Sequence, residues 1–323
     1  MASQQLRVVV TSAGGRVGKE ICARLKQSGR DVFIRACCRR PERVEFLKEL
    51  GVDEIVRFEY TDPSTFDAAV KDMNCIYSSS PDPALKGHQE FCTYLKNTNH
   101  TIQHAVRLSC MGAEQNTASY KGHVFTKGAA IPHMLEGYWL AEKYLIETGI
   151  PVTVVRANFF MTHLVKPDIQ NIIDNGFFTF PLSDNRNSFV STNDLGEIAA
   201  KALIEGPKVH GDKFYDITGP EPQSMYDVAD VLTEVLGKKV EYKETSPEKF
   251  IADFGQTRWE FIEYLRKGFY LRVSPDYYNL TGKKSTNYLQ HMTKKGAAGE
   301  SGVEELYQAG MWTKGVDLFK EKK

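Results

Sequence analysis

The sequence lacks an excess of charge of either sign. Lysine and arginine total 41 residues, aspartate and glutamate also total 41, and the formal net charge is zero. Such a chain creates no global positive field to attract phosphate backbones, which argues against nucleic acid as a partner. No apolar run approaches the 18 or so residues that a bilayer span needs, and the first residues contain no apolar signal core. The sequence predicts a cytoplasmic protein with no membrane partner.

Several arrangements of reactive residues are also missing. The six cysteines show no C-x-x-C spacing, and Cys37 and Cys38 are adjacent, so neither a disulfide framework nor a zinc site is predicted. His100 and His104 are four residues apart but have no carboxylate support, and no metal site is expected. No G-x-S-x-G motif of a serine hydrolase occurs. The composition is that of a globular protein, 41% hydrophobic and 25% charged, in 323 residues, a length that allows two domains.

Short β-branched runs alternate with amphipathic stretches through the first half of the chain. This alternation predicts an α/β fold, a doubly wound parallel sheet with helices on both faces. We expect strands at Leu6–Val10, Val32–Cys37, Glu54–Phe58, Cys75–Ser79, Val106–Leu108 and Val152–Arg156, and helices that start near Gly15, Pro41, Ser64, Leu85 and Ile131.

After Arg156 the alternation weakens, and a smaller, mostly helical part is predicted. A late helix at Thr192–Glu205 and a late strand at Phe214–Thr218 still follow the earlier pattern. The segment Ser246-Pro247-Glu248 supplies an N-cap, a proline and an acid for a helix that includes Phe250–Lys267. Aromatic residues are frequent in this part. A small core is the simpler interpretation of them, and a pocket is the alternative.

A glycine-rich turn follows the first predicted strand. A dinucleotide fold needs small residues there, because the backbone must turn tightly, approach the pyrophosphate and let the next helix pack closely. Gly15 and Gly18 have the expected spacing, whereas Ser12 stands where a glycine is usual. The alternative is an ordinary turn between strand and helix. The predicted nucleotide contacts here are Thr11, Ser12, Gly14, Gly15, Arg16, Val17 and Gly18.

Two arginines end the second predicted strand, where the adenosine ribose of a dinucleotide lies. An acid at this place would bind a free 2′-hydroxyl, whereas the forked donors of Arg39 and Arg40 suit a 2′-phosphate. The pair therefore favours NADP over NAD. A solvated helix start is the alternative interpretation.

Further segments carry a resemblance that covers nearly the whole chain. With the glycine turn and Arg39, the chain resembles the NmrA-like family of atypical short-chain dehydrogenases/reductases. The resemblance rests on the segments Asp62-Pro63-Ser64-Thr65-Phe66, Ser109-Cys110-Met111-Gly112-Ala113, Ala141-Glu142-Lys143-Tyr144-Leu145, Gly149 to Phe160, Asp194 to Ala200, Tyr215 to Glu221, Val228 to Leu232 and Leu280-Thr281-Gly282-Lys283.

The resemblance implies a Rossmann domain that binds NADP and a smaller part that closes a cleft above the nicotinamide. We expect the NADP-binding domain at residues 1–158, with 187–218 returning to it, and the substrate-binding part at 159–186 and 219–323. Family members include reductases of quinones, dyes, imines and conjugated double bonds, as well as regulators that only bind the nucleotide. Further cofactor contacts are expected at strand ends and beside the nicotinamide: Glu59, Ser79, Ser80, Ser109, Cys110, Tyr138, Asn158 and Phe159.

The catalytic prediction centres on the helix that carries Tyr138. Ordinary short-chain dehydrogenases have Tyr-x-x-x-Lys there, but Glu142 occupies the lysine position and favours a neutral phenol. A neutral phenol can donate a proton but is a poor base, so reduction is favoured over alcohol oxidation. Packing on the sheet is an equal alternative for Tyr138. His133, one turn earlier, is a second catalytic candidate, with exposure at the helix start as the commoner interpretation.

Together with what the resemblance implies, these patterns predict an NADPH-dependent reductase that transfers hydride to an electron-poor C=C, C=N or quinone of a small apolar or aromatic substrate. The alternative is a non-catalytic, NADP-binding redox sensor that acts through a protein partner. A monomer and a homodimer are both open.

Overall fold

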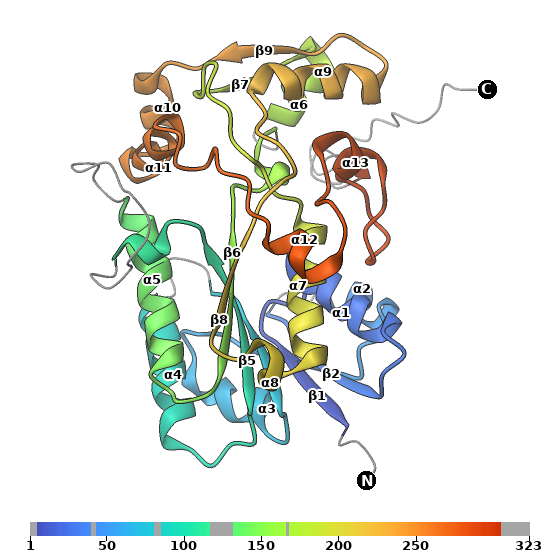
Figure 1. The fold of residues 1–323 in the computed structure, drawn as a ribbon, viewed down its shortest axis with the longest axis vertical. Helices are drawn as coiled ribbons and strands as arrows, with labels where there is room; N and C mark the ends of the chain where they lie inside the picture. The colour runs from blue at the N-terminus through green and yellow to red at the C-terminus, as the bar shows by residue number, and fades with distance from the viewer. Residues whose placement is uncertain (1–4, 40–42, 81–84, 117–131, 166–167, 305–323) are drawn as a thin grey trace.

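The computed structural model describes residues 5–39, 43–80, 85–116, 132–165 and 168–304. Its centre is a seven-stranded parallel sheet with strand order β3-β2-β1-β4-β5-β6-β8, which confirms the predicted doubly wound α/β fold (Figure 1). The order reverses between β1 and β4, where ligands bind in open parallel sheets. The strands are β1 (Leu6–Val10), β2 (Val32–Cys37), β3 (Glu54–Val56), β4 (Cys75–Ser78), β5 (His104–Cys110), β6 (Val152–Ala157) and β8 (Lys213–Ile217).

Helices cover both faces of this sheet. Alternate residues of a strand point to opposite faces, so Val8 and Val10 pack in one hydrophobic cluster and Val9 in the other. The first face carries α1 (Arg16–Gln27), α2 (Val44–Glu49) and α7 (Thr192–Glu205). The second carries α3 (Phe66–Val70), α4 (Leu85–Asn97) and α5 (His133–Ile146), and the short helices η2 (Pro63–Thr65), η4 (Ala113–Asn116) and α8 (Pro207–His210) lie in connections.

A smaller group of elements gathers at one end of the sheet (Figure 1). Its strands β7 (Phe177–Phe180) and β9 (Glu241–Glu244) pair in parallel. Its apolar side chains form a separate cluster with a few residues of the sheet half. The helices of this group are η5 (Met161–His163), α6 (Ile169–Asn175), α9 (Met225–Leu236), α10 (Pro247–Phe254), α11 (Gln256–Arg266) and α13 (Tyr288–Thr293), while α12 (Asp276–Thr281) packs against β8 and α7.

The prediction of one continuous helix over Phe250–Lys267 is wrong. The chain divides there into α10 and α11 at Gly255, whose φ of 89° lies in the left-handed region that glycine adopts without strain. The predicted start is correct, because Ser246 caps the helix through a hydrogen bond to its side chain from the Lys249 amide. The break matters for the site, since it lets α11 turn back toward the sheet end.

Residues near the end of the described chain contact α1, the helix that follows the first strand, and hold it in place. The Glu20 carboxylate on α1 accepts hydrogen bonds from the backbone amides of Ala297 and Ala298, at 2.8 and 2.9 Å. Lys19 forms an ion pair with Glu300. We call residues 296–300 the strap.

Among the described residues, no helix combines the length and apolar character that a membrane crossing requires.

Candidate functional site

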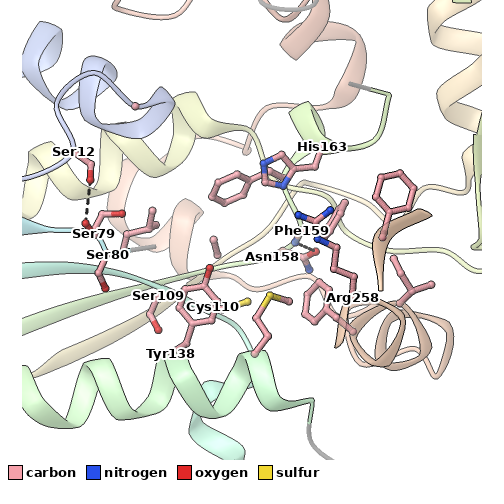
Figure 2. A pocket seen from close by; sticks show the side chains of 18 of the residues that line it. Ser12, Ser79, Ser80, Ser109, Cys110, Tyr138, Asn158, Phe159, His163 and Arg258 are labelled. Atoms are coloured by element: carbon pink, nitrogen blue, oxygen red, sulfur yellow. Dashed lines mark hydrogen bonds between the residues drawn. The ribbon is translucent and has the colours of Figure 1, made fainter. Parts of the chain in front are cut away.

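A cavity of about 1310 Å³ opens at the carboxyl ends of the strands and continues into the smaller group of elements (Figure 2). Its walls come from the turn after β1, the ends of β2, β4, β5 and β6, and helices α5, α6, α10 and α11. Most of the predicted site residues line it: Thr11, Ser12, Gly14, Gly15, Arg39, Glu59, Ser79, Ser80, Ser109, Cys110, Tyr138, Asn158 and Phe159.

The glycine turn places an uncapped helix end at the cavity. Gly15 is the N-cap of α1, and no side chain caps the first turn. A Cβ atom on Gly18 would lie 2.0 Å from the Ser12 carbonyl oxygen, so only glycine lets α1 approach the turn this closely. Val17 and Gly18 are buried behind the turn, and Arg16 is half-buried at the first helical position.

Ser12 fits the turn without left-handed backbone geometry, because its φ is not positive. Its hydroxyl instead donates a hydrogen bond of 3.0 Å to the Ser79 carbonyl at the end of β4. The Ser79 amide in turn donates to the Thr11 hydroxyl at 3.0 Å. These bonds join the β1 and β4 ends where the strand order reverses, so the serine stabilises this part of the cavity wall.

Basic side chains stand at the end of β2. Arg39 is exposed and lines the cavity, and Arg40 lies outside the described residues. Arg43, which the sequence analysis did not single out, lines the same wall, and a Cβ on Gly14 would lie 3.4 Å from its side chain. The run of basic residues around Pro41 was the signal available for it. Glu59 lines this end too and pairs with Arg57 at 3.0 Å.

A buried ionic network supports the middle of the cavity. The Ser109 hydroxyl donates to the Glu142 carboxylate, which also accepts bonds of 3.0 and 2.7 Å from Arg156. Glu114 lies 3.7 Å from Arg156, and burial raises the pKa of its carboxyl. Because the Ser109 proton is directed at Glu142, the lone pairs of Ser109 are left to accept bonds on the cavity side.

Tyr138 projects from α5 into the cavity near Ser109 and Cys110 (Figure 2). Its helix neighbours Leu135, Ala141 and Leu145 are buried, whereas Tyr138 is half-buried. His133 is placed differently. Its side chain is 79% exposed and does not line the cavity, and Nδ1 lies 3.1 Å from the Glu260 carboxylate, which raises its pKa. The structure gives this histidine no position from which to reach a ligand in the cavity.

The end of β6 forms the opposite wall. Asn158 is buried, donates a bond of 3.1 Å to the Tyr270 carbonyl and accepts one of 2.7 Å from the Phe159 amide. These bonds hold the turn that presents the Phe159 ring to the cavity. The Tyr270 hydroxyl lies 2.9 Å from the Cys110 sulfur and donates to the Met111 carbonyl at 2.6 Å.

The family model of the NmrA-like family matches residues 4–267. The chain belongs to the NmrA-like family. The resemblance carried by the sequence motifs is therefore confirmed.

Curated relatives of this NmrA-like chain include enzymes, and its structural neighbours include an enzyme and a regulator. It is 24% identical over 286 residues to a (4-alkanoyl-5-oxo-2,5-dihydrofuran-3-yl)methyl phosphate reductase of Streptomyces griseus, covering 85% of this chain and 93% of that one. An NADPH-dependent quinone oxidoreductase of Escherichia coli, complexed with NADPH, has a similar structure, with a TM-score of 0.71, 18% identity and coverage of 88% and 97%. A negative transcriptional regulator complexed with NADP matches with a TM-score of 0.68, 15% identity and coverage of 98% and 99%.

The far end of the cavity in this NmrA-like chain contains residues that sequence reasoning missed. Aromatic rings form much of the wall, and polar side chains interrupt them. We call this end the aromatic chamber; its lining includes Phe159, His163, Asp168, Phe177, Thr179, Phe180, Lys249, Phe250, Asp253, Phe254, Arg258 and Phe261. Of the aromatic residues of the C-terminal part, Phe250, Phe254 and Phe261 line the cavity, whereas Trp259, Tyr264 and Tyr288 are buried elsewhere. Both interpretations of the aromatic content therefore hold, for different residues.

Proposed function

We propose that this chain is an NADPH-dependent reductase that transfers hydride to an electron-poor C=C, C=N or quinone carbon of a small apolar or aromatic substrate. The observation that carries the proposal is the continuity of the cavity, which runs from the glycine turn past Tyr138 into the aromatic chamber. A reductase needs both a nucleotide site and open apolar space beside the reacting end of the nucleotide.

The described residues fit NADPH. The uncapped N-terminus of α1 presents backbone amides to a pyrophosphate, and Gly14 and Gly15 allow its close approach. Arg39 and Arg43 supply forked donors for a 2′-phosphate at the end of β2. Ser109, Asn158 and Phe159 would hold the nicotinamide end. We propose that residues 1–158 and 187–218 bind the cofactor, and that 159–186 and 219–323 bind the substrate.

The chemistry divides between cofactor and chain. When bound, NADPH supplies the hydride, which adds to the electron-poor carbon. The atom that gains the electron pair then takes a proton, and the Tyr138 phenol or water donates it. Glu142 occupies the position of the usual lysine and is committed to Ser109 and Arg156, so that position supplies no cation to stabilise a phenolate. A neutral phenol favours reduction over oxidation.

A regulator that binds NADP without turnover is the competing function, because one structural relative is a transcriptional regulator. Such a protein has no need of free space beside the nicotinamide. The open aromatic chamber therefore favours the reductase.

Calorimetric titration with NADPH and NADH in identical buffer tests the cofactor. We expect micromolar NADPH binding and a preference over NADH of about tenfold, or about 1.4 kcal/mol. Oxidation of NADPH, followed by absorbance with quinones, enones and imines, then tests turnover. Binding without turnover on any acceptor class would favour the sensor, and binding of neither nucleotide would overturn both functions.

Tyr138→Phe tests the proton donor. We expect turnover to fall about a hundredfold while the affinity for NADPH stays largely intact, since general acids contribute about 10²–10⁴-fold. Tyr144→Phe, on the same helix but outside the cavity lining, is the matched control. Equal turnover in both variants would assign Tyr138 to packing.

A further inference from the structure

The aromatic chamber contains an arginine whose hydrogen-bonding capacity is not used within the described chain. Figure 2 shows Arg258 extending from α11 into the pocket, toward the wall that carries Phe159. Its guanidinium lies 5.8 Å from the centroid of the Phe254 ring, one helical turn away across the break at Gly255. Among the described residues, no carboxylate lies within ion-pair distance of Arg258, and no carbonyl accepts a bond from it.

The acids nearest in the chamber are already engaged. The Asp253 carboxylate pairs with Lys249 at 2.8 Å. The Asp168 carboxylate accepts bonds of 2.5 and 2.6 Å from the backbone amide and hydroxyl of Thr179. The acids of the chamber are therefore not available to neutralise Arg258, and Lys249 is less available than Arg258 to meet an incoming anion.

Apolar rings line the chamber into which Arg258 extends, where an anion bound to this arginine would lie. The rings of Phe250 and Phe254 are 4.8 Å apart, and the ring of Phe159 lies 5.9 Å from that of Phe261. His163 stands against Phe159, with ring centroids 5.8 Å apart. A planar ligand between these rings would exclude water from the guanidinium, and removal of water strengthens the attraction between an arginine and an oxyanion.

We propose that the aromatic chamber selects substrates that carry an oxyanion group, a carboxylate, sulfonate or phosphate, on an aromatic or otherwise planar apolar body, and that Arg258 binds this group. The proposal rests on the proposed reductase, since it defines the substrate class of the same cavity. The planar body would lie between the rings beside Phe159, and the oxyanion would face α11. Arg258 acts here as a specificity-determining residue and takes no part in the transfer of hydride or proton.

A pair of fluorescent probes tests the site without any turnover. 8-Anilinonaphthalene-1-sulfonate and N-phenyl-1-naphthylamine share their rings and differ in the sulfonate. With saturating NADP present, we expect Arg258→Gln to weaken the binding of the sulfonate probe at least tenfold and to leave the affinity for the neutral probe unchanged. Arg258→Lys, which keeps the charge but loses the fork, should restore part of the affinity.

Arg266→Gln is the matched control, because it removes the same charge from the same helix. Arg266 stacks near Trp259 at 5.7 Å but already pairs with Glu244 at 3.7 Å and does not line the cavity. We expect both probes to bind this variant as they bind the native chain. An equal loss of affinity for the sulfonate probe in Arg258→Gln and Arg266→Gln, or no loss in either variant, would overturn the proposal.

Turnover separates this proposal from the proposed function. With 1,2-naphthoquinone and 1,2-naphthoquinone-4-sulfonate as acceptors, we expect the native chain to favour the sulfonate in kcat/KM at least tenfold, and Arg258→Gln to lose that preference. Reduction of both quinones with no preference in the native chain would overturn the anion site and leave the reductase standing. A probe site that depends on Arg258, with no oxidation of NADPH, would leave the anion site and overturn the reductase.

Discussion

The two ends of the cavity are built in different ways. One end is lined by the glycine turn and carries the proposed NADPH site, and we call it the nucleotide end. Its wall consists largely of backbone and small side chains at strand ends, such as Ser12, Gly15 and Ser79. At the other end, most of the aromatic chamber consists of large side chains from η5, β7, α10 and α11. The first end is determined by the course of the chain, and the second by which residues the helices carry. A family can therefore keep one ligand at the first end while its members change the ligand at the second.

The largest effect is expected in the buried ionic network that supports the middle of the cavity, between the two ends. Arg156 is 5% exposed and compensates Glu142 and Glu114, so Arg156→Met should lower the free energy of unfolding by about 3–5 kcal/mol. Urea denaturation measures the loss. Lys143→Met removes a pair of 3.8 Å with Glu147 and a contact of 5.5 Å with the Trp139 ring, both on the surface of α5, and should cost less than about 1 kcal/mol. Similar losses in the two variants would show that the buried network stabilises the fold no more than a surface ion pair does.

The next effect concerns a buried histidine where α13 meets the start of α7. Burial lowers the pKa of His291 to about 4, and its Nδ1 lies 3.0 Å from the Ser191 hydroxyl oxygen. Between pH 6.5 and 4 the unfolded chain binds a proton that the folded chain excludes. The free energy of unfolding should therefore fall with falling pH by about 1.4 kcal/mol per unit from this residue.

His291→Gln should remove that part of the pH dependence, measured by denaturation at a series of pH values. His133→Gln is the control, because Glu260 raises the pKa of exposed His133, which gives a pH dependence of opposite sign. An unchanged profile in His291→Gln would mean that His291 is not the group excluded from protonation.

A pair of glycines tests the backbone character of the nucleotide end. Helix propensity alone predicts that alanine stabilises both Gly18 in α1 and Gly137 in α5 by about 1 kcal/mol. A Cβ at Gly137 meets nothing within 4 Å, whereas at Gly18 it meets the Ser12 carbonyl. Gly18→Ala should instead lower the free energy of unfolding by about 1–3 kcal/mol. It should also weaken the binding of NADPH, measured by calorimetry, more than Gly137→Ala does. Equal free energies of unfolding in the two variants, measured by urea denaturation, would contradict the packing role of Gly18, and identical nucleotide affinities would contradict its place beside the nucleotide.

The smallest effect concerns the basic side chains at the end of β2. The double variant Arg39→Ala/Arg43→Ala should weaken the binding of NADPH about tenfold more than the binding of NADH, because only NADPH carries the 2′-phosphate. Calorimetric titration with each nucleotide measures the ratio. Arg30→Ala, an exposed arginine that does not line the cavity, should change neither affinity. Equal weakening of both nucleotides would remove the phosphate assignment.

The same contrast explains what the sequence could predict. β-Branched runs predict the strands because a parallel sheet buries both faces, and the glycine turn is predictable because its residues are contiguous. Arg258 gave no signal, since its place depends on the break at Gly255 and on how α11 folds back over the sheet end. His163 lies one turn beyond the predicted Phe159 and was missed because no spacing rule connects η5 with the cavity. The position of His133 depends on a partner, Glu260, that is 127 residues away.

The position of the strap in the sequence also determines how late α1 can gain its final contacts during synthesis. Glu20 is made early, but its partner Ala297 is synthesised 277 residues later. At about 5–20 residues per second, a growing chain carries α1 without this partner for about 14–55 s. The helix whose N-terminus faces the proposed pyrophosphate site is thus among the first to be made and among the last to be fully held in place. The contacts that hold α1 in place are therefore complete only after residues 296–300 have left the ribosome.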